Sequence, residues 1–230
     1  MLRYTPSPYT EKKKMKHVIL AATLMLAQLT VAATAGVTVL DGDTLNVNGQ
    51  SVRLNGIDAP ETGQLCKKKD GGNWACGKVA TKHLQKLVRG NRVSCEHREF
   101  DQYGRSIGVC YANGVELNAA MIEAGLAWSF RRYSSDYNRL ESQVKKTGRG
   151  IWQAKTMPAW EFRAQKWKAA SQKASGRCNI KGNINRKGQR IYHMPWQRYY
   201  GRTRINTAKG ERWFCDENEA RAAGWRKSRR

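Results

Sequence analysis

The sequence predicts a mixed α+β protein, in which a small β-barrel is covered by helices and followed by a second, smaller module. Segments with strand-like alternation and turn residues occur early, one helical segment lies between strands, and the later segments have helical spacing. This order of elements is typical of a small closed barrel with helical cover. A chain of 230 residues has room for one such domain and a small addition.

Residues 1–35 are typical of an export signal. Lysines between positions 12 and 16 precede a short apolar stretch that ends in small residues. Cleavage is possible after Ala33 or after Ala35. An uncleaved anchor is the alternative, although the apolar run is marginal for a membrane-spanning helix. We therefore expect a periplasmic or secreted protein with no stable membrane span once the signal is removed.

The first strands form a hairpin over the segment "TLNVNGQSVRL". Asn48 and Gly49 suit the two central positions of a type I′ turn, both of which need positive φ. This turn fixes the register, so that Arg53 faces Thr44 and its guanidinium lies beside Asp43.

Helical spacing recurs in three later segments. Residues 73–89 are predicted to form a helix ended by Gly90, and 116–128 and 136–148 form two more. Between the first and second helices, a Gly-containing turn near 101–104 joins two strands.

The six cysteines are expected to be paired, because an exported protein meets an oxidising environment. Reflection through the turn near residue 102 brings Cys95 opposite Cys110. Cys66 and Cys76 flank one loop and close it. Cys178 and Cys215 remain for each other, with metal binding together with His193 as the alternative. The absence of a CxxC pair argues against zinc in the main domain.

The formal net charge of +24 indicates a polyanionic partner. Residues 163–230 contain 19 lysines and arginines against 4 aspartates and glutamates. Aromatic side chains interleave with these cations at Trp196, Tyr199, Tyr200 and Trp213. They suit a platform for nucleic acid, or alternatively the core that such a small module needs.

Three carboxylates and one arginine are expected to meet at one edge of the barrel. Asp43 lies beside Arg53 in the hairpin register, and Asp58 and Glu61 follow on the next strand and turn. One arginine cannot balance three close carboxylates, so a hard cation such as calcium or magnesium is expected among their oxygens. Arg53 then remains free to bind an anion, which suits a phosphodiester substrate.

Four separated segments, "VLDGDTLNV", "VRLNGIDAPET", "DQYGRSIGVCYANG" and "LNAAMIEAGLAW", together resemble the staphylococcal nuclease (thermonuclease) family over about residues 36–152. The resemblance implies a five-stranded OB-type β-barrel with three helices. It also implies calcium-dependent hydrolysis of DNA and RNA that leaves 3′-phosphate ends.

By the same resemblance, Asp43, Asp58 and the backbone carbonyl of Ala59 would bind Ca²⁺. Glu61 would act as the general base that activates water. Arg53 and Arg105 would be the two catalytic arginines that bind the phosphate.

The segment "WSFRRYSSDY" departs from the family pattern, with Arg131 where the archetype has a tyrosine. Tyr133 is the candidate for stacking on a nucleotide, with simple packing as the alternative. Arg131 and Tyr133 are accordingly expected to form part of the nucleic-acid-binding surface.

The predicted organisation is a signal segment (1–35), a nuclease domain (36–155), a linker (156–176) and a basic C-terminal module (177–230) that resembles the sunset domain. The leading function is an exported nuclease, expected to be a monomer that acts on DNA and RNA. The rival is a noncatalytic nucleic-acid-binding protein, because an OB scaffold serves both purposes.

Overall fold

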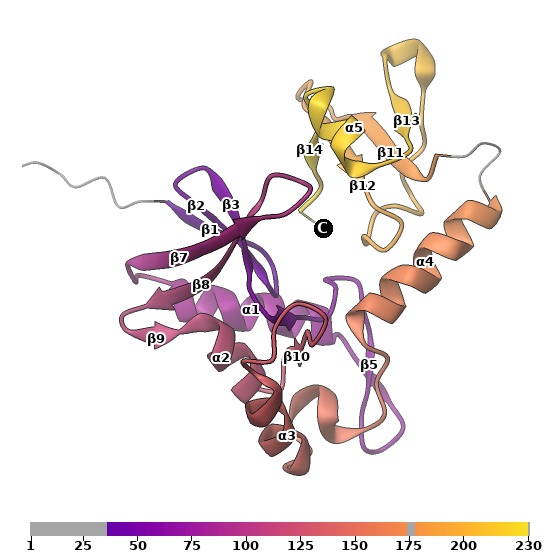
Figure 1. Cartoon of the computed structure of the whole chain (residues 1–230). Helices are drawn as coiled ribbons and strands as arrows, with labels where there is room; N and C mark the ends of the chain where they lie inside the picture. Colours follow the sequence, from indigo (N-terminus) through magenta and orange to yellow (C-terminus); the bar gives the residue numbers. More distant parts are fainter. Residues whose placement is uncertain (1–35, 174–177, 230) are drawn as a thin grey trace, which may run out of the picture. The chain divides into compact units, whose positions relative to one another are not determined.

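The computed structural model describes residues 36–173 and 178–229 (Figure 1). The predicted signal segment and its cleavage positions lie outside these residues. Within the two described ranges, no helix combines the length and the apolarity that crossing a bilayer requires.

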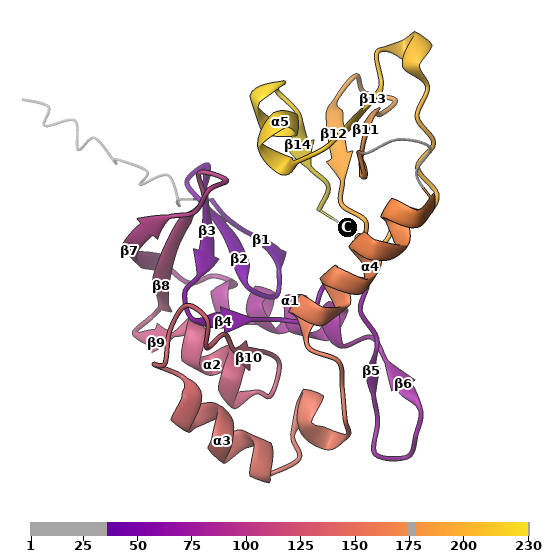
Figure 2. The same ribbon diagram turned by 45° about the vertical axis from the view of Figure 1, so that its right-hand side comes forward.

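The main sheet is a curled half-barrel, visible in Figures 1 and 2. Its strands follow the order β1-β2-β3-β8-β7, and the short β9 (Val115–Glu116) pairs with β8. Neighbouring strands are antiparallel except β3 and β8, which are parallel. The bounds are β1 Val37–Asp41, β2 Thr44–Val47, β3 Gln50–Leu54, β7 Val93–Phe100 and β8 Ser106–Ala112. The end strands β1 and β7 do not pair with each other in the described sheet. The predicted barrel is therefore confirmed as a curled sheet with helical cover, while its closure and its count of five strands are not confirmed.

The predicted hairpin is confirmed in its register. Asn48 and Gly49 have φ values of 53° and 87°, as a type I′ turn requires, and Thr44 pairs with Arg53. The same register buries Leu45 and Val52, which face the core.

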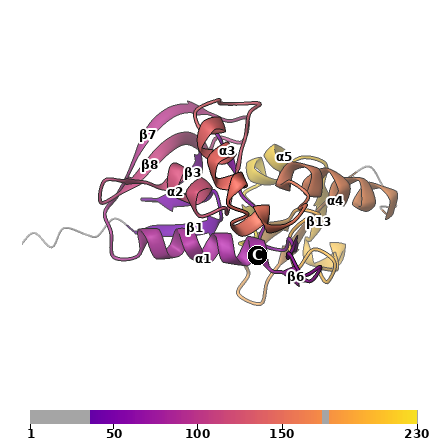
Figure 3. The same ribbon diagram turned by 90° about the horizontal axis from the view of Figure 1, so that it is seen from below.

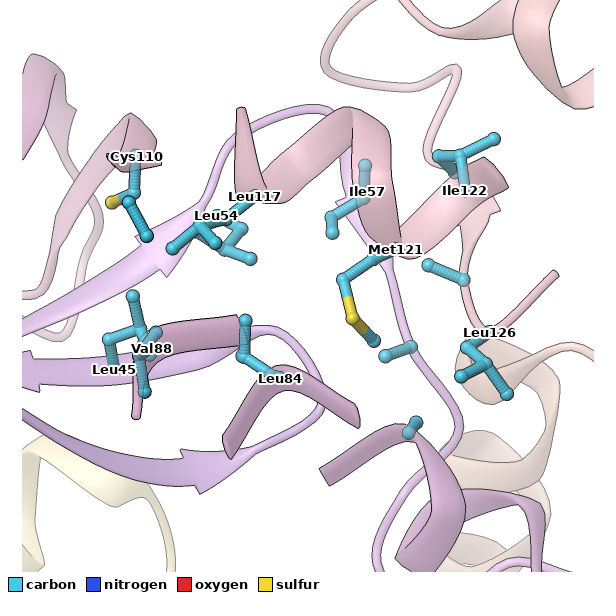
Figure 4. Close-up of a cluster of buried hydrophobic side chains, with 14 of the residues drawn as sticks. Leu45, Leu54, Ile57, Leu84, Val88, Cys110, Leu117, Met121, Ile122 and Leu126 are labelled. Atoms are coloured by element: carbon cyan, nitrogen blue, oxygen red, sulfur yellow. The ribbon is translucent and has the colours of Figure 1, made fainter. Parts of the chain in front are cut away.

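Helices α1 (Cys76–Val88) and α2 (Leu117–Glu123) pack on the sheet, and α3 (Asn138–Lys146) packs on α2 (Figure 3). The apolar face of α1 presents Ala80, Leu84 and Val88, which are buried with Leu45 and Met121 in one core (Figure 4). At about 25 cal/mol per Å² of apolar surface, burial of this kind is the main contribution to stability.

All three predicted helices are shorter than expected, since α3 spans Asn138–Lys146 and not 136–148. In α1 and α2 the reason is that short strands occupy their ends. Helix α1 starts at Cys76 because β6 (Asn73–Trp74) pairs with β5 (Cys66–Lys67). Helix α2 ends at Glu123, Gly125 adopts a φ of 64°, and β10 (Trp128–Ser129) then pairs with β4 (Ile57–Asp58).

All three predicted disulfides are confirmed. Cys95 and Cys110 are opposed on β7 and β8, as the reflected register required. Cys66 joins Cys76 across the loop between β5 and α1. The last pair, Cys178 and Cys215, is a disulfide, which excludes the alternative in which both cysteines bind a metal.

The segment predicted as a linker is largely helical. A short 3-10 helix, η1 (Gly150–Gln153), precedes α4 (Ala159–Lys173). The first turn of α4 is packed on the preceding domain: Ala159 is fully buried, and Trp160 stacks on Phe130 with ring centroids 5.5 Å apart.

The C-terminal module contains its own sheet, in the order β13-β11-β12-β14. Its elements are β11 Ile180–Ile184, β12 Arg190–His193, η2 Thr207–Lys209, β13 Arg212–Phe214, α5 Glu217–Ala222 and β14 Arg226–Lys227. Tyr192, Phe214 and Trp225 are buried in its core. Asp216 caps α5 by accepting a hydrogen bond from the backbone N–H of Glu219, at 2.8 Å.

Candidate active site

Asp43, Arg53 and Asp58 meet at one end of the curled sheet. Asp43 directly precedes β2, Arg53 lies on β3, and Asp58 ends β4. Arg53 donates from Nη1 to Asp43 at 3.0 Å and from Nη2 to Asp58 at 2.8 Å. Asp43 and Asp58 are only 4% and 0% exposed. The structure therefore brings together the two carboxylates and the arginine that the hairpin register placed side by side.

The Asp43 carboxylate is held from several sides. Its Oδ1 also accepts from the Thr44 hydroxyl at 2.9 Å, and its Oδ2 accepts from the backbone N–H of Ala59 at 3.0 Å. Burial acts to raise the pKa of Asp43, but the Arg53 charge and the Ala59 hydrogen bond outweigh it and hold this pKa at about 2. Asp43 is therefore ionised at any physiological pH.

Asp41, two residues earlier, has the opposite electrostatic setting. Its Oδ1 accepts from the backbone N–H of Asp43 at 3.2 Å. Desolvation, with the charges of Asp43 and Glu61 adding to it, raises the pKa of Asp41 to about 7. The cluster therefore holds two neighbouring aspartates with very different proton affinities.

Glu61 joins the cluster from the turn after β4. Its backbone N–H donates to the Gln64 side chain at 3.2 Å, and the Gln64 amide donates to the carbonyl of Met157 at 2.7 Å. Burial raises the pKa of Glu61, opposed by the neighbouring Arg163. A base with a raised pKa takes up a proton more readily than an ordinary glutamate does.

Gly77 at the start of α1 allows the helix to approach the Glu61 turn closely. A Cβ at position 77 would lie 1.7 Å from the carbonyl oxygen of Glu61. Only glycine fits at this distance, so the lack of a side chain at position 77 lets the helix lie close to the Glu61 turn and fixes their relative position.

Arg163, on α4, is the residue of this cluster that sequence reasoning missed. It donates from Nη1 and Nη2 to the two oxygens of Asp58 at 3.0 and 2.9 Å, and from Nη1 to Glu61 at 2.8 Å. Burial acts to lower the pKa of Arg163, but Asp58 and Glu61 outweigh this and raise it. The three carboxylates outnumber Arg53, which indicated that a further positive group was needed. Nothing in the sequence identified that group as an arginine about 100 positions away.

Arg105 is fixed in the turn between β7 and β8. Its Nε pairs with Asp101 at 2.6 Å, and its backbone N–H donates to the same carboxylate at 2.9 Å. Its guanidinium lies 5.4 Å from the centre of the Tyr103 ring. Arg53, Glu61, Arg105 and Arg163 all line one cavity.

The two predicted nucleic-acid-binding residues differ in their surroundings. Tyr133 is 59% exposed, lines the same cavity and lies against Phe130 at 4.9 Å. Arg131 pairs with Glu141 at 3.1 Å, and its neighbour Arg132 lines the cavity in its place.

The donor set fits a hard divalent cation in its chemistry, because Asp43 and Asp58 offer only oxygen ligands. In the arrangement described, however, both oxygens of Asp58 accept from guanidinium groups. Over residues 36–173 and 178–229, no three His, Cys, Asp or Glu side chains are grouped as a ready metal site. The positive charge that these carboxylates require is supplied by Arg53 and Arg163.

A curled sheet with helical cover, ending in buried carboxylates and arginines beside a cavity, is an arrangement suited to phosphate chemistry. Residues 51–154 match the family described as "Staphylococcal nuclease homologue". An uncharacterized endonuclease of Escherichia coli O157:H7 is 36% identical in an alignment of 138 residues that covers 56% of this chain and 84% of that protein. The chain belongs to the staphylococcal nuclease family.

Other relatives carry different names. The micrococcal nuclease of Shigella flexneri is 32% identical in an alignment of 157 residues that covers 60% of this chain and 82% of that protein. The succinoglycan biosynthesis protein ExoI of Rhizobium meliloti is 36% identical in an alignment of 119 residues that covers 50% of this chain and 62% of that protein. The family match ends at residue 154, before α4 and the C-terminal module.

Proposed function

We propose that the chain is an exported, calcium-dependent nuclease that hydrolyses phosphodiester bonds of DNA and RNA with little sequence specificity. The observation that carries this proposal is the meeting of Asp43, Asp58, Glu61 and Arg53 in one buried cluster beside a cavity that Arg105 also lines. Each of these residue types has a distinct part in phosphodiester hydrolysis.

Glu61 takes the proton from the attacking water. Water oxygen forms a bond to phosphorus, and the bond from phosphorus to the 5′ oxygen breaks. The leaving 5′ oxygen takes up a proton from solvent water, so the products are a 3′-phosphate and a 5′-hydroxyl end. Burial, which raises the pKa of Glu61, makes its carboxylate a better proton acceptor. The same raised pKa means that acid removes the base form at a higher pH than for an ordinary glutamate.

Arg53 and Arg105 hold the phosphate by charge-assisted hydrogen bonds. Both guanidinium groups are anchored by carboxylates, Arg53 by Asp43 and Asp58, and Arg105 by Asp101. Preorganised donors of this kind strengthen as negative charge builds on the phosphate oxygens in the transition state.

Asp43, Asp58 and the Ala59 backbone carbonyl are the groups that would hold Ca²⁺. A bound calcium ion would supply Lewis-acid polarisation of the phosphate. The charge on Asp43, whose pKa is held at about 2, is available to such an ion over the whole physiological pH range.

Export of the chain is proposed on two grounds. The basic and apolar pattern of residues 1–35 is typical of a signal peptide, and three disulfides are typical of an oxidising compartment.

The test is an incubation of the purified full chain with plasmid DNA and with RNA, in calcium or in EGTA, beside Glu61→Gln. We expect cleavage in calcium, none in EGTA, 3′-phosphate ends, and a fall in turnover of about 10²- to 10⁴-fold in the variant at nearly unchanged substrate binding. Cleavage in EGTA, or full activity of Glu61→Gln, would refute the mechanism. Binding of nucleic acid without any cleavage would instead favour the noncatalytic rival.

A further inference from the structure

The contact of Arg163 with the carboxylate cluster comes from outside the part of the chain that matches the nuclease family. The match covers residues 51–154, whereas Arg163 lies in the second turn of α4. Helix α4 is held there independently of the ion pairs, because Ala159 is buried with Trp128 and Ile151. The helix therefore delivers a guanidinium to the site from a fixed position.

The geometry of this contact is that of a strong ion pair. Arg163 grips both oxygens of Asp58 with its two Nη atoms and reaches Glu61 at 2.8 Å. Two parallel N–H···O bonds between a guanidinium and a carboxylate are charge-assisted and geometrically specific. The Asp58 side chain is 0% exposed, so water cannot replace these bonds without a rearrangement.

The same contact places the Arg163 guanidinium on the Asp58 oxygens that a bound cation would use as ligands. Asp58 also accepts from Arg53, so three N–H groups already use its two oxygens. A carboxylate offers about four lone-pair sites, and a guanidinium a few ångströms away repels a divalent ion. Arg53 also pairs with Asp43 and lies on a strand, whereas Arg163 is the partner supplied by a separate helix.

We infer that Arg163 is a built-in counterion of the cation-free site, which competes with Ca²⁺ for Asp58 and releases both Asp58 and Glu61 when the ion binds. This inference rests on the proposed function, since it concerns the cation of that site. The Arg163 side chain is 20% exposed and lines the cavity, so it has space to move into when it is displaced. Its contact keeps the carboxylates close together before the ion arrives and lowers the affinity for the ion.

The test is a calorimetric titration of the full-length, disulfide-bonded chain with CaCl₂ in the absence of nucleic acid. Arg163→Gln is expected to bind Ca²⁺ about tenfold or more tightly than the wild type, because the competing charge is gone. The matched control is Lys168→Gln, which removes one positive charge from an exposed position of the same helix and is expected to leave the affinity within about twofold.

Thermal unfolding supplies a second measurement that does not depend on activity. Without calcium, Arg163→Gln is expected to unfold at a lower temperature than the wild type, because it leaves the buried Asp58 with Arg53 alone. Saturating calcium should raise the unfolding temperature of the variant by more than it raises that of the wild type.

Arg163→Lys keeps the positive charge but cannot form the two parallel hydrogen bonds to Asp58. This variant is used for the same measurement if Arg163→Gln does not fold. We expect it to bind Ca²⁺ with an affinity between those of the wild type and the glutamine variant. Equal or weaker calcium binding by the variants, or no calcium binding by any of the proteins, would overturn the inference. A wild type that cuts DNA only in calcium, beside variants that bind the ion no more tightly, would refute the counterion role and leave the proposed function intact.

Discussion

Charged side chains are buried at the end of the curled sheet that holds Asp43, Arg53 and Asp58, here called the barrel end, and also in the C-terminal module. Two of the buried charges in the module, Glu211 and Lys181, are neutralised differently from those at the barrel end. At the barrel end, Asp43 and Asp58 are paired with the side chains of Arg53 and Arg163. In the module, Glu211 accepts from the backbone N–H groups of residues 184 and 206 at 3.0 and 2.8 Å. Lys181 likewise donates to the backbone carbonyls of residues 200 and 203.

A buried charge that is bonded to a side chain can exchange its partner for a ligand, whereas a charge that is bonded to the backbone cannot. A backbone group is fixed by the strand or turn to which it belongs, so a charge bonded to it is part of the fold. A guanidinium on a long side chain can rotate away, so a carboxylate paired with it can accept a ligand in its place. We therefore interpret the barrel end as a site, and Glu211 and Lys181 of the module as scaffold. Glu217 of the module pairs with the side chains of Arg221 and Lys227 and falls outside this scaffold class.

The largest effect that tests this comparison is expected at Arg53. Arg53→Gln removes the proposed donor to the substrate phosphate and is expected to lower kcat by about 10²- to 10³-fold. The measurement is steady-state cleavage of DNA in calcium, with circular dichroism to confirm the fold.

The matched control is Arg212→Gln in the module. Arg212 also pairs with a carboxylate, Glu219 at 2.8 Å, but its side chain is 50% exposed. We expect kcat within about twofold of the wild type and little change in stability, as for other exposed pairs. Equal losses of activity in both variants would remove the distinction between the two regions.

An intermediate effect is expected in the pH dependence of stability, through His193, which is buried in the module. Its Nε2 lies 2.8 Å from Asn183, and its buried Nδ1 has no partner among the described residues. Burial, and secondarily the charge of Lys181, lowers the pKa of His193 from 6.5 to about 4. Between these two pH values the unfolded chain binds a proton that the folded chain does not, so stability falls as the pH falls.

We expect the His193 effect to cost about 2 kcal/mol of the free energy of unfolding between about pH 7 and pH 4, after allowance for partial solvent screening. Chemical denaturation at a series of pH values measures it. His193→Gln should lose this part of the pH dependence. A variant with the same acid sensitivity as the wild type would show that other groups cause it.

The smallest effect is expected at Tyr133. Removal of an exposed ring that lines the cavity should weaken nucleotide stacking, so Tyr133→Ala is expected to raise KM for single-stranded DNA about fivefold with kcat nearly unchanged. Arg131→Ala, which breaks only the pair with Glu141, should change KM by less than about twofold. The reverse order of the two effects would assign substrate contact to Arg131 instead.

Local chemistry allowed much of this structure to be predicted from the sequence. The Asn48-Gly49 turn fixed the register that places Arg53 by Asp43, and turn geometry paired Cys95 with Cys110. Features that depend on distant partners were not predictable in the same way. The start of α1 moved because β5 and β6 pair across a disulfide-closed loop, and Arg163 joined the site because α4 packs on Trp128.

The close approach of Gly77 to Glu61 determines which substitutions the domain can accept at position 77. At that point the helix and the turn carrying Glu61 are separated by less than the width of a methyl group. A single added carbon must push either α1 out of its core or the carboxylate away from its partners. The absence of a Cβ atom at Gly77 thus fixes the distance between α1 and the turn that positions the Glu61 carboxylate.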